Sequence, residues 1–267
     1  ELYSVSQIRE LETMLATQYR LSAAELMSRA GMAGLKAIGQ QWPWVKHILV
    51  ICGSGNNGGD GLVLAKAALA EKYQIHVIQL GDPATMSEAA RAAREALLAT
   101  GTEIHQFNGK LPHADVIVDA LFGTGLNREV SGDYAAVINK INEQSQQVPV
   151  LSLDIPSGIQ ADTGLALGLA VQASMTLSFL GLNTGLFSAE APNYTGKIGF
   201  DGLHAPARAY QAFKPSARRV TLDNDAAAHL APRQRTAHKG LYGHLLVIGG
   251  DQGMSGAARM AAEAACR

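Results

Sequence analysis

Short apolar runs that alternate with helical segments constrain this sequence more than any other feature. The first run, at 47–52, is almost entirely aliphatic and ends at a glycine, which is typical of a parallel strand buried on both faces. This alternation predicts an α/β fold, a doubly wound, Rossmann-like and mostly parallel sheet with helices on both faces. Further strands are expected at 74–80, 103–107, 115–119, 148–153, 175–180 and 197–200, and helices at 62–73, 87–100 and 134–142.

The first forty residues lack a strand pattern and instead predict two helices. Ser4 or Ser6 is a candidate N-cap for the first helix, which has apolar residues on one stripe. Ser22 and Glu25 have the spacing of a capping box at the start of the second.

The sequence changes character after about residue 204. The segment 204–240 contains three prolines, mixed charge and weak periodicity, which predicts a connecting segment. A further apolar strand is expected at 243–249, followed by a glycine turn and an alanine-rich helix without a stop signal. We therefore expect one domain at 1–215, and a linker with the opening strand and helix of a second domain at 216–267.

Composition excludes several classes of protein. The 267 residues have a formal net charge of -1 and are 17% charged and 47% hydrophobic, which excludes a disordered chain and argues against binding to nucleic acid through phosphates. No apolar run approaches the ~18 residues of a membrane span, and the N-terminus does not have a signal-peptide pattern. Cys52 and Cys266 are too few for a disulfide framework. We expect a cytoplasmic protein with a small-molecule partner, no nucleic acid and no membrane; its oligomeric state is left open, with a homo-oligomer as one candidate.

A glycine-rich segment, GSGNNGGDG at 53–61, follows the first predicted strand. Gly53, Gly55 and Gly58 match the dinucleotide fingerprint G-x-G-x-x-G between a strand and a helix. Such a segment brings the backbone and a helix N-terminus close to a phosphate, although a tight turn also needs glycines. The asparagines and the aspartate of this segment add amide and carboxylate oxygens, which suit hydroxyl groups and hard cations.

Two later predicted strands each end at an aspartate. Asp119 is followed by the turn GTG at 123–125, and Asp154 is followed by IPSG at 155–158. A single aspartate at a strand end is often a cap or a turn former. The carboxyl ends of parallel strands share one sheet edge, however, so these carboxylates are expected beside Asn57. Together they predict a cation site and a general acid or base.

In combination, the segments 53–61, 119–129 and 154–158 resemble the NAD(P)HX epimerases, the N-terminal family of a bifunctional nicotinamide-repair enzyme. The likeness runs from about residue 4 to residue 203. The glycine-rich tail at 239–258 resembles the opening of the partner domain, an ADP- or ATP-dependent NAD(P)HX dehydratase with a ribokinase-like fold. NADHX and NADPHX are hydrated forms of the reduced nucleotides, and the family implies interconversion of their R and S forms. The resemblance therefore implies an isomerase, whose parent protein is also a lyase.

The resemblance also implies roles for individual residues. Potassium would be held by Asn57, Asp119 and Ser157 with backbone carbonyls. Asp154 would lie against the nicotinamide part, and we expect it to be the catalytic acid or base. ADP or ATP, with magnesium as a further candidate, would serve the dehydratase of the parent. The implied substrate-binding residues are Asn56, Asn57, Gly58, Gly59, Asp60, Gly123, Thr124, Gly125, Leu126, Asn127, Arg128, Glu129, Tyr134, Asp154 and, for the tail, Ala257.

Two other functions fit parts of the pattern. An NAD-dependent oxidoreductase needs an acidic residue about 20 positions after the fingerprint to bind the ribose, and Asp82, 24 residues after Gly58, matches only loosely. A non-catalytic scaffold of the same fold has no need of several carboxylates at one sheet edge. The epimerase is therefore the function that we expect, through either ring opening or loss and return of water.

Overall fold

The computed structural model of this protein describes residues 1–220, 235–241, 243–251, 253 and 255–266. The chain divides into two compact units, Glu1–Arg219 and Val220–Arg267. The first unit contains a seven-stranded sheet and the cavity described below.

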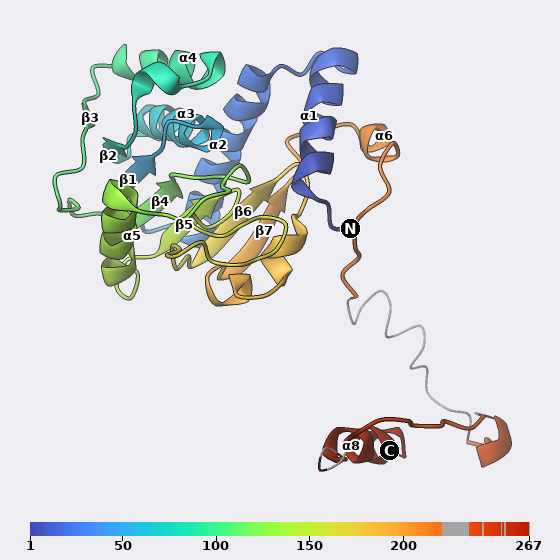
Figure 1. Ribbon diagram of the computed structural model, residues 1–267. Helices are drawn as coiled ribbons and strands as arrows, with labels where there is room; N and C mark the ends of the chain where they lie inside the picture. Colours follow the sequence, from blue (N-terminus) through green and yellow to red (C-terminus); the bar gives the residue numbers. More distant parts are fainter. Residues whose placement is uncertain (221–234, 242, 252, 254, 267) are drawn as a thin grey trace. The chain divides into compact units, whose positions relative to one another are not determined.

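The sheet of the first unit has the strand order β3-β2-β1-β4-β5-β6-β7, and every neighbouring pair is parallel (Figure 1). The strands are β1 His47–Cys52, β2 Gln74–Gln79, β3 Ile104–His105, β4 Val116–Ala120, β5 Val150–Leu153, β6 Met175–Phe179 and β7 Lys197–Asp201. This order confirms the predicted doubly wound sheet. The order reverses between β1 and β4, and the crevice outside the carboxyl ends of such strands is where doubly wound folds bind ligands.

Helices cover both faces of the sheet. On one face, apolar side chains of α2, α3 and α4 share a core with Val50 and Val118; on the other, α5 packs against Leu49 and Ile117. Ser4 caps α1 through a capping box with Gln7, so Ser4 rather than Ser6 starts that helix. The helices are α1 Val5–Gln18, α2 Ala23–Gln41, α3 Asn56–Ala70, α4 Glu88–Leu98, α5 Gly132–Gln144 and α6 Ala207–Tyr210, with short 3-10 turns at η1 Pro83–Thr85, η2 Thr184–Phe187 and η3 Ala191–Asn193.

Helix α3 begins six residues before the predicted start at residue 62, inside the glycine-rich segment. Glycine has a low helix propensity, which favours a loop when the sequence is considered locally. Tertiary packing overrides this preference, because α3 lies close to its neighbours. A Cβ at Gly59 would be 2.6 Å from the Met27 side chain, and one at Gly61 would be 2.7 Å from the Ala120 side chain.

The second unit contains η5 Lys239–Leu241 and α8 Gly256–Ala265 in its described residues. The predicted alanine-rich helix is therefore present. The strand predicted at 243–249 is wrong: these residues form no strand, and Leu245, Leu246 and Ile248 are 71%, 80% and 86% exposed. A strand needs a neighbour to pair its N–H and C=O groups, and the described part of this unit offers none. Among the helices in the described residues, none has the length and apolar character to cross a membrane.

Candidate active site

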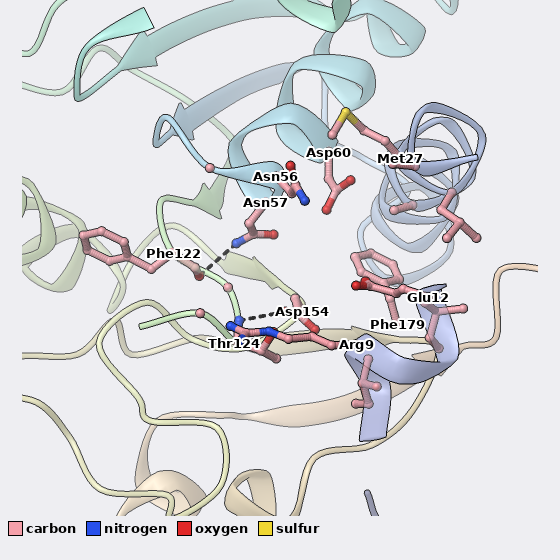
Figure 2. A pocket seen from close by; sticks show the side chains of 18 of the residues that line it. Arg9, Glu12, Met27, Asn56, Asn57, Asp60, Phe122, Thr124, Asp154 and Phe179 are labelled. Carbon is pink, nitrogen blue, oxygen red and sulfur yellow. Dashed lines mark hydrogen bonds between the residues drawn. The ribbon is translucent and has the colours of Figure 1, made fainter. Parts of the chain in front are cut away.

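A cavity of about 710 Å³ lies at the carboxyl ends of β1, β4 and β5 (Figure 2). Its walls come from the start of α3, from the loop after β4, from the residue after β5, and from α1 and α2. This volume lies within the range of small-molecule and cofactor sites. The first unit therefore has a cavity at the position where its fold usually binds ligands.

Two glycines allow the chain to turn tightly between β1 and α3. A Cβ at Gly53 would lie 2.1 Å from the carbonyl oxygen of Leu121, and one at Gly58 would lie 2.0 Å from the carbonyl oxygen of Gly53. Any side chain at these positions would displace the backbone. The N-cap residue, Gly55, makes no side-chain capping bond, so the N-terminus of α3 begins at the cavity without a side-chain cap.

Asn57 connects the segments that follow β4 and β5. Its Nδ2 donates to the carbonyl oxygens of Phe122 at 2.9 Å and Leu153 at 3.2 Å. The side chain is buried, with 6% of the residue exposed. Its Oδ1 is also buried and has no hydrogen-bond partner among the described residues. A buried oxygen without a donor is a candidate cation ligand.

Asp119 lies within β4 and is completely buried. Its Oδ2 accepts hydrogen bonds from Ser152 Oγ at 2.7 Å and from the Ser157 N–H at 2.9 Å. Its Oδ1 accepts from Ser157 Oγ at 2.5 Å and from the Leu121 N–H at 3.3 Å. Burial raises the pKa of Asp119 above its usual value despite these donors. Ser157 Oγ in turn accepts from the Phe122 N–H at 2.9 Å, which ties the β4 and β5 segments together.

Asp154 follows β5 and faces the cavity. Its backbone is left-handed, with φ of +65°, a conformation that few residues other than glycine adopt. Its N–H donates to the Leu177 carbonyl at 2.8 Å, and its Oδ2 accepts from the Thr124 N–H at 3.1 Å. Burial, assisted by the charge of Glu12, raises the pKa of Asp154 to about 6. A carboxyl group with this pKa is suited to proton transfer near neutral pH.

Two further carboxyl groups line the same cavity, Asp60 from α3 and Glu12 from α1 (Figure 2). Burial raises the pKa of Asp60 well above its usual value, and the charges of Asp154 and Glu12 raise it further. Burial also raises the pKa of Glu12, while Arg9 lowers it. Like charges disfavour simultaneous ionisation. The cavity therefore favours a state in which at least one of the carboxyl groups of Asp60, Glu12 and Asp154 holds a proton.

The predicted substrate-binding residues lie in four places. Gly58 and Gly59 are buried within α3, Glu129 lies against Gly168, and Ala257 is exposed on α8 of the second unit. The others line the cavity: Asn56, Asn57, Asp60, Gly123, Thr124, Gly125, Leu126, Asn127, Arg128, Tyr134 and Asp154. The expected cation ligands are linked by hydrogen bonds: Asn57, in the cavity wall, and Ser157 both contact the Phe122 backbone, and Ser157 donates to Asp119.

Sequence reasoning missed part of the cavity wall. Arg9 and Glu12 line the cavity from α1, and no motif distinguishes them from other polar residues of an amphipathic helix. Met27 belongs to the hydrophobic core and also lines the cavity. The Phe122 ring packs against Tyr134 with centroids 4.6 Å apart. Two features of the sequence could have indicated this pair: the resemblance implied a role for Tyr134, and Phe122 immediately precedes the GTG turn.

Asp82, the loose match to a ribose-binding acid, does not line the cavity. Its Oδ1 accepts a hydrogen bond from the Ala84 N–H and caps the η1 turn. The structure therefore explains Asp82 as a turn former and gives the oxidoreductase interpretation no support from this residue.

Comparison with known proteins adds independent information. The family described as "YjeF-related protein N-terminus" matches residues 23–185. The chain is 45% identical over 268 residues to a bifunctional NAD(P)H-hydrate repair enzyme of Coxiella burnetii, covering 100% of this chain and 54% of that protein. It is 38% identical to the bifunctional enzyme of Escherichia coli, covering 100% of this chain and 51% of that protein. The chain thus spans about half the length of these relatives.

A shorter relative and a solved structure extend the comparison. The chain is 34% identical to an NAD(P)H-hydrate epimerase of Legionella pneumophila, over 84% of this chain and 85% of that protein. The crystal structure of the yeast protein YNL200c matches with a TM-score of 0.69 and 22% identity, covering 83% of this chain and 97% of the yeast chain. The structural match supports the fold.

Proposed function

The chain belongs to the YjeF-related N-terminal family, and from this membership we propose that its first unit is an isomerase that interconverts the R and S forms of NADHX and NADPHX. The names of the Coxiella, Escherichia and Legionella relatives support this substrate class. The single observation in the site that carries the proposal is Asp154, a cavity carboxyl group with a pKa of about 6.

Epimerisation of a hydrated nicotinamide inverts the ring carbon that bears the hydroxyl group. Ring opening and loss of water both require a group that donates a proton and accepts it back, and neither requires a redox cofactor. Asp154 suits this role because the Thr124 N–H orients its Oδ2 and its pKa lies close to neutral pH. We propose that Asp154 is the catalytic acid and base of the reaction.

The remainder of the cavity suits the rest of a dinucleotide. The uncapped N-terminus of α3, at Gly55 and Asn56, is a favourable place for the substrate phosphates. Arg128 and Asn127 line the cavity from the loop after β4 and can add a positive charge and hydrogen bonds. We propose that Asn56, Asn57, Asp60 and the residues at 123–128, which line the cavity, bind the substrate in this way.

We further propose that Asn57, Asp119 and Ser157 hold a potassium ion with backbone carbonyl oxygens. Three observations support the fit: the unpartnered Oδ1 of Asn57, the buried Asp119 carboxylate with its raised pKa, and the Phe122 carbonyl oxygen 3.3 Å from Ser157 Oγ. When bound, the ion would supply positive charge that stabilises the Asp119 carboxylate and orders the adjoining loops.

The potassium proposal can be tested by thermal unfolding in potassium chloride and in choline chloride of equal ionic strength. We expect a midpoint higher by on the order of a few degrees in potassium, because an ion that binds only the folded state stabilises it. Ser157→Ala should reduce this difference, while Ser145→Ala, at the end of α5 outside the site, should keep it. Equal midpoints for the wild type in both salts would contradict the proposal.

The epimerase proposal can be tested with a coupled assay. R-NADPHX is supplied with an S-specific dehydratase and ADP, and the appearance of NADPH is followed by its absorbance. We expect this protein to accelerate NADPH formation from the R form, and to leave the rate from the S form unchanged. Folded protein that does not change the rate from the R form would contradict the proposal.

We propose that the complete protein is bifunctional and also dehydrates the S form with ADP or ATP; in support, the Coxiella and Escherichia relatives are named bifunctional NAD(P)H-hydrate repair enzymes and are about twice as long as this chain. The domains would be 1–215 for the epimerase and 216–267 for the linker and the start of the dehydratase, with Ala257 in the latter. The described part of the second unit contains no sheet on which to build a nucleotide site. This chain alone should therefore not form NADPH from S-NADPHX and ADP above the protein-free rate.

The free thiols of Cys52 and Cys266 are consistent with a cytoplasmic, reducing compartment.

A further inference from the structure

A cluster of two histidines and one aspartate lies at the amino ends of the strands, away from the cavity residues. His47 begins β1, while His113 and Asp115 precede β4. The cavity residues follow the carboxyl ends of the same strands. A strand of five residues separates the two ends by roughly 17 Å. This cluster therefore has no direct contact with the proposed epimerisation chemistry.

The side-chain atoms of the cluster are close enough to share one ion. His47 Nδ1 lies 3.1 Å from Asp115 Oδ2, and His113 Nε2 lies 3.9 Å from Asp115 Oδ1. One ligand atom from each residue falls within 4.8 Å of the others. Two ligands of a tetrahedral zinc ion, each about 2.0–2.2 Å from the metal, are about 3.3–3.5 Å apart. The 3.1 Å and 3.9 Å distances, which end on the two different oxygens of Asp115, lie on either side of that value, and the set with one atom from each residue lies within 4.8 Å.

The backbone holds the Asp115 carboxylate in place. Its Oδ2 accepts hydrogen bonds from the N–H groups of Lys46 and His47, each at 2.8 Å. In the described part of the chain, its Oδ1 accepts no hydrogen bond and faces His113, which is too far away to donate one. The His113 side chain is 81% exposed, so an ion from solvent can reach this side of the cluster. A positioned carboxylate oxygen with two imidazoles beside it is a preformed set of three ligands.

We propose that His47, His113 and Asp115 bind a divalent transition metal ion of the zinc type, with water in the fourth position. Two imidazole nitrogens and one carboxylate oxygen favour Zn²⁺ or Co²⁺ over Mg²⁺ and Ca²⁺, which prefer oxygen ligands. The bound ion joins the start of β1 to the segment before β4. Its effect is stabilisation of this end of the sheet, because an ion that binds the folded state shifts the unfolding equilibrium.

The test uses the full chain without an affinity tag, first treated with a chelator. Isothermal titration with Zn²⁺ should give one site per chain, and Co²⁺ should give the visible absorption of a tetrahedral nitrogen and oxygen site. The midpoint of thermal unfolding should rise with Zn²⁺. A wild-type chain that binds no Zn²⁺ would overturn the proposal.

His113→Ala and His105→Ala form a matched pair of variants. Both histidines are exposed and have a carboxylate oxygen 3.9 Å away, but among the described residues His105 pairs with Glu103 and belongs to no three-residue cluster. We expect His113→Ala to lower Zn²⁺ affinity about tenfold or more, and His105→Ala to leave it unchanged. Zn²⁺ binding that survives His113→Ala at full affinity, or that His105→Ala weakens equally, would overturn the assignment. Because His113 is exposed, its replacement should leave the fold intact, which circular dichroism can verify.

Discussion

The ends of β4 and β5 carry the same residue type in opposite surroundings. Asp119 is still inside β4, where it pairs in register with Ser152 and is completely buried. Asp154 comes one residue after β5, and its left-handed backbone accompanies a side chain that lines the cavity. Within the described residues, Asp119 accepts four hydrogen bonds, whereas Asp154 accepts one, from Thr124.

Residue type alone therefore does not determine the role of a side chain at a strand end. A carboxylate held by four donors is oriented, screened from solvent and suited to a structural or cation-binding role. A carboxyl group with one donor and a pKa of about 6 can exchange a proton with a ligand. The position of each aspartate relative to the last residue of its strand accounts for the difference.

The largest expected effect that tests this comparison is on catalysis. Asp154→Asn keeps the shape of the side chain and its bond from Thr124 but cannot exchange a proton. We expect epimerase activity to fall on the order of 10²–10⁴-fold while circular dichroism remains unchanged. Asp82→Asn, outside the cavity, is the control and should retain wild-type activity. An Asp154→Asn variant with a near wild-type rate in the coupled assay would rule out the proposed role.

Asp119→Asn should act on stability. An amide NH₂ in place of Oδ2 would face the Ser152 hydroxyl and the Ser157 N–H, and each buried donor left without an acceptor destabilises the fold. We expect the free energy of unfolding to fall by about 2–4 kcal/mol, measured by urea denaturation. Unchanged stability would mean that the four hydrogen bonds of Asp119 do not hold the β4 and β5 segments together.

Asp154→Asn should have the opposite effect on stability. The pKa of Asp154 is about 6 in the folded state and about 3.9 in an unfolded chain. The folded state therefore binds more protons, and the free energy of unfolding of the wild type falls as pH rises from about 4 to about 6. Removing the carboxyl group should raise stability at pH 8 by about 1–3 kcal/mol and change it little at pH 4. A variant that is less stable than the wild type at pH 8 would contradict the conclusion that burial destabilises the charged form of Asp154.

The smallest effect on stability is expected at the other end of β4, where the Asp115 side chain is partly exposed. Backbone hydrogen bonds from Lys46 and His47 hold the pKa of Asp115 at about 2. A folded-state pKa below the unfolded value contributes stability above about pH 4, which is lost as pH falls toward 2. Asp115→Asn should therefore lower stability by about 0.5–1 kcal/mol at pH 7 and have little effect at pH 2. An equal loss at both pH values would show that ionisation of Asp115 is not the cause.

The strands of the sheet and the role of the fingerprint glycines could be predicted from the sequence alone. All seven strands of the sheet were predicted. The signal is strongest for β1, β4, β5 and β6, because a buried parallel strand is a mostly apolar run and this pattern is local. The fingerprint glycines were also evident, and the structure supplies the reason at Gly53 and Gly58, where a Cβ would collide with a backbone carbonyl. The acidic strand ends and Asn57 were placed at one sheet edge, since parallel strands share that edge.

Only the tertiary structure decided which side chains meet. Arg9 and Glu12 line the cavity because α1 packs across the carboxyl end of the sheet, and no local pattern encodes that contact. The early start of α3 and the missing strand at 243–249 have different causes. Packing overrode the low helix propensity of glycine in α3, whereas the described part of the second unit offers no strand for 243–249 to pair with. The separate surroundings of Asp119 and Asp154 depend on register between neighbouring strands, because Asp119 pairs with Ser152 and Asp154 comes two residues later. Periodicity locates an element to within a few residues, whereas the chemistry of a side chain depends on which atoms from distant parts of the chain surround it.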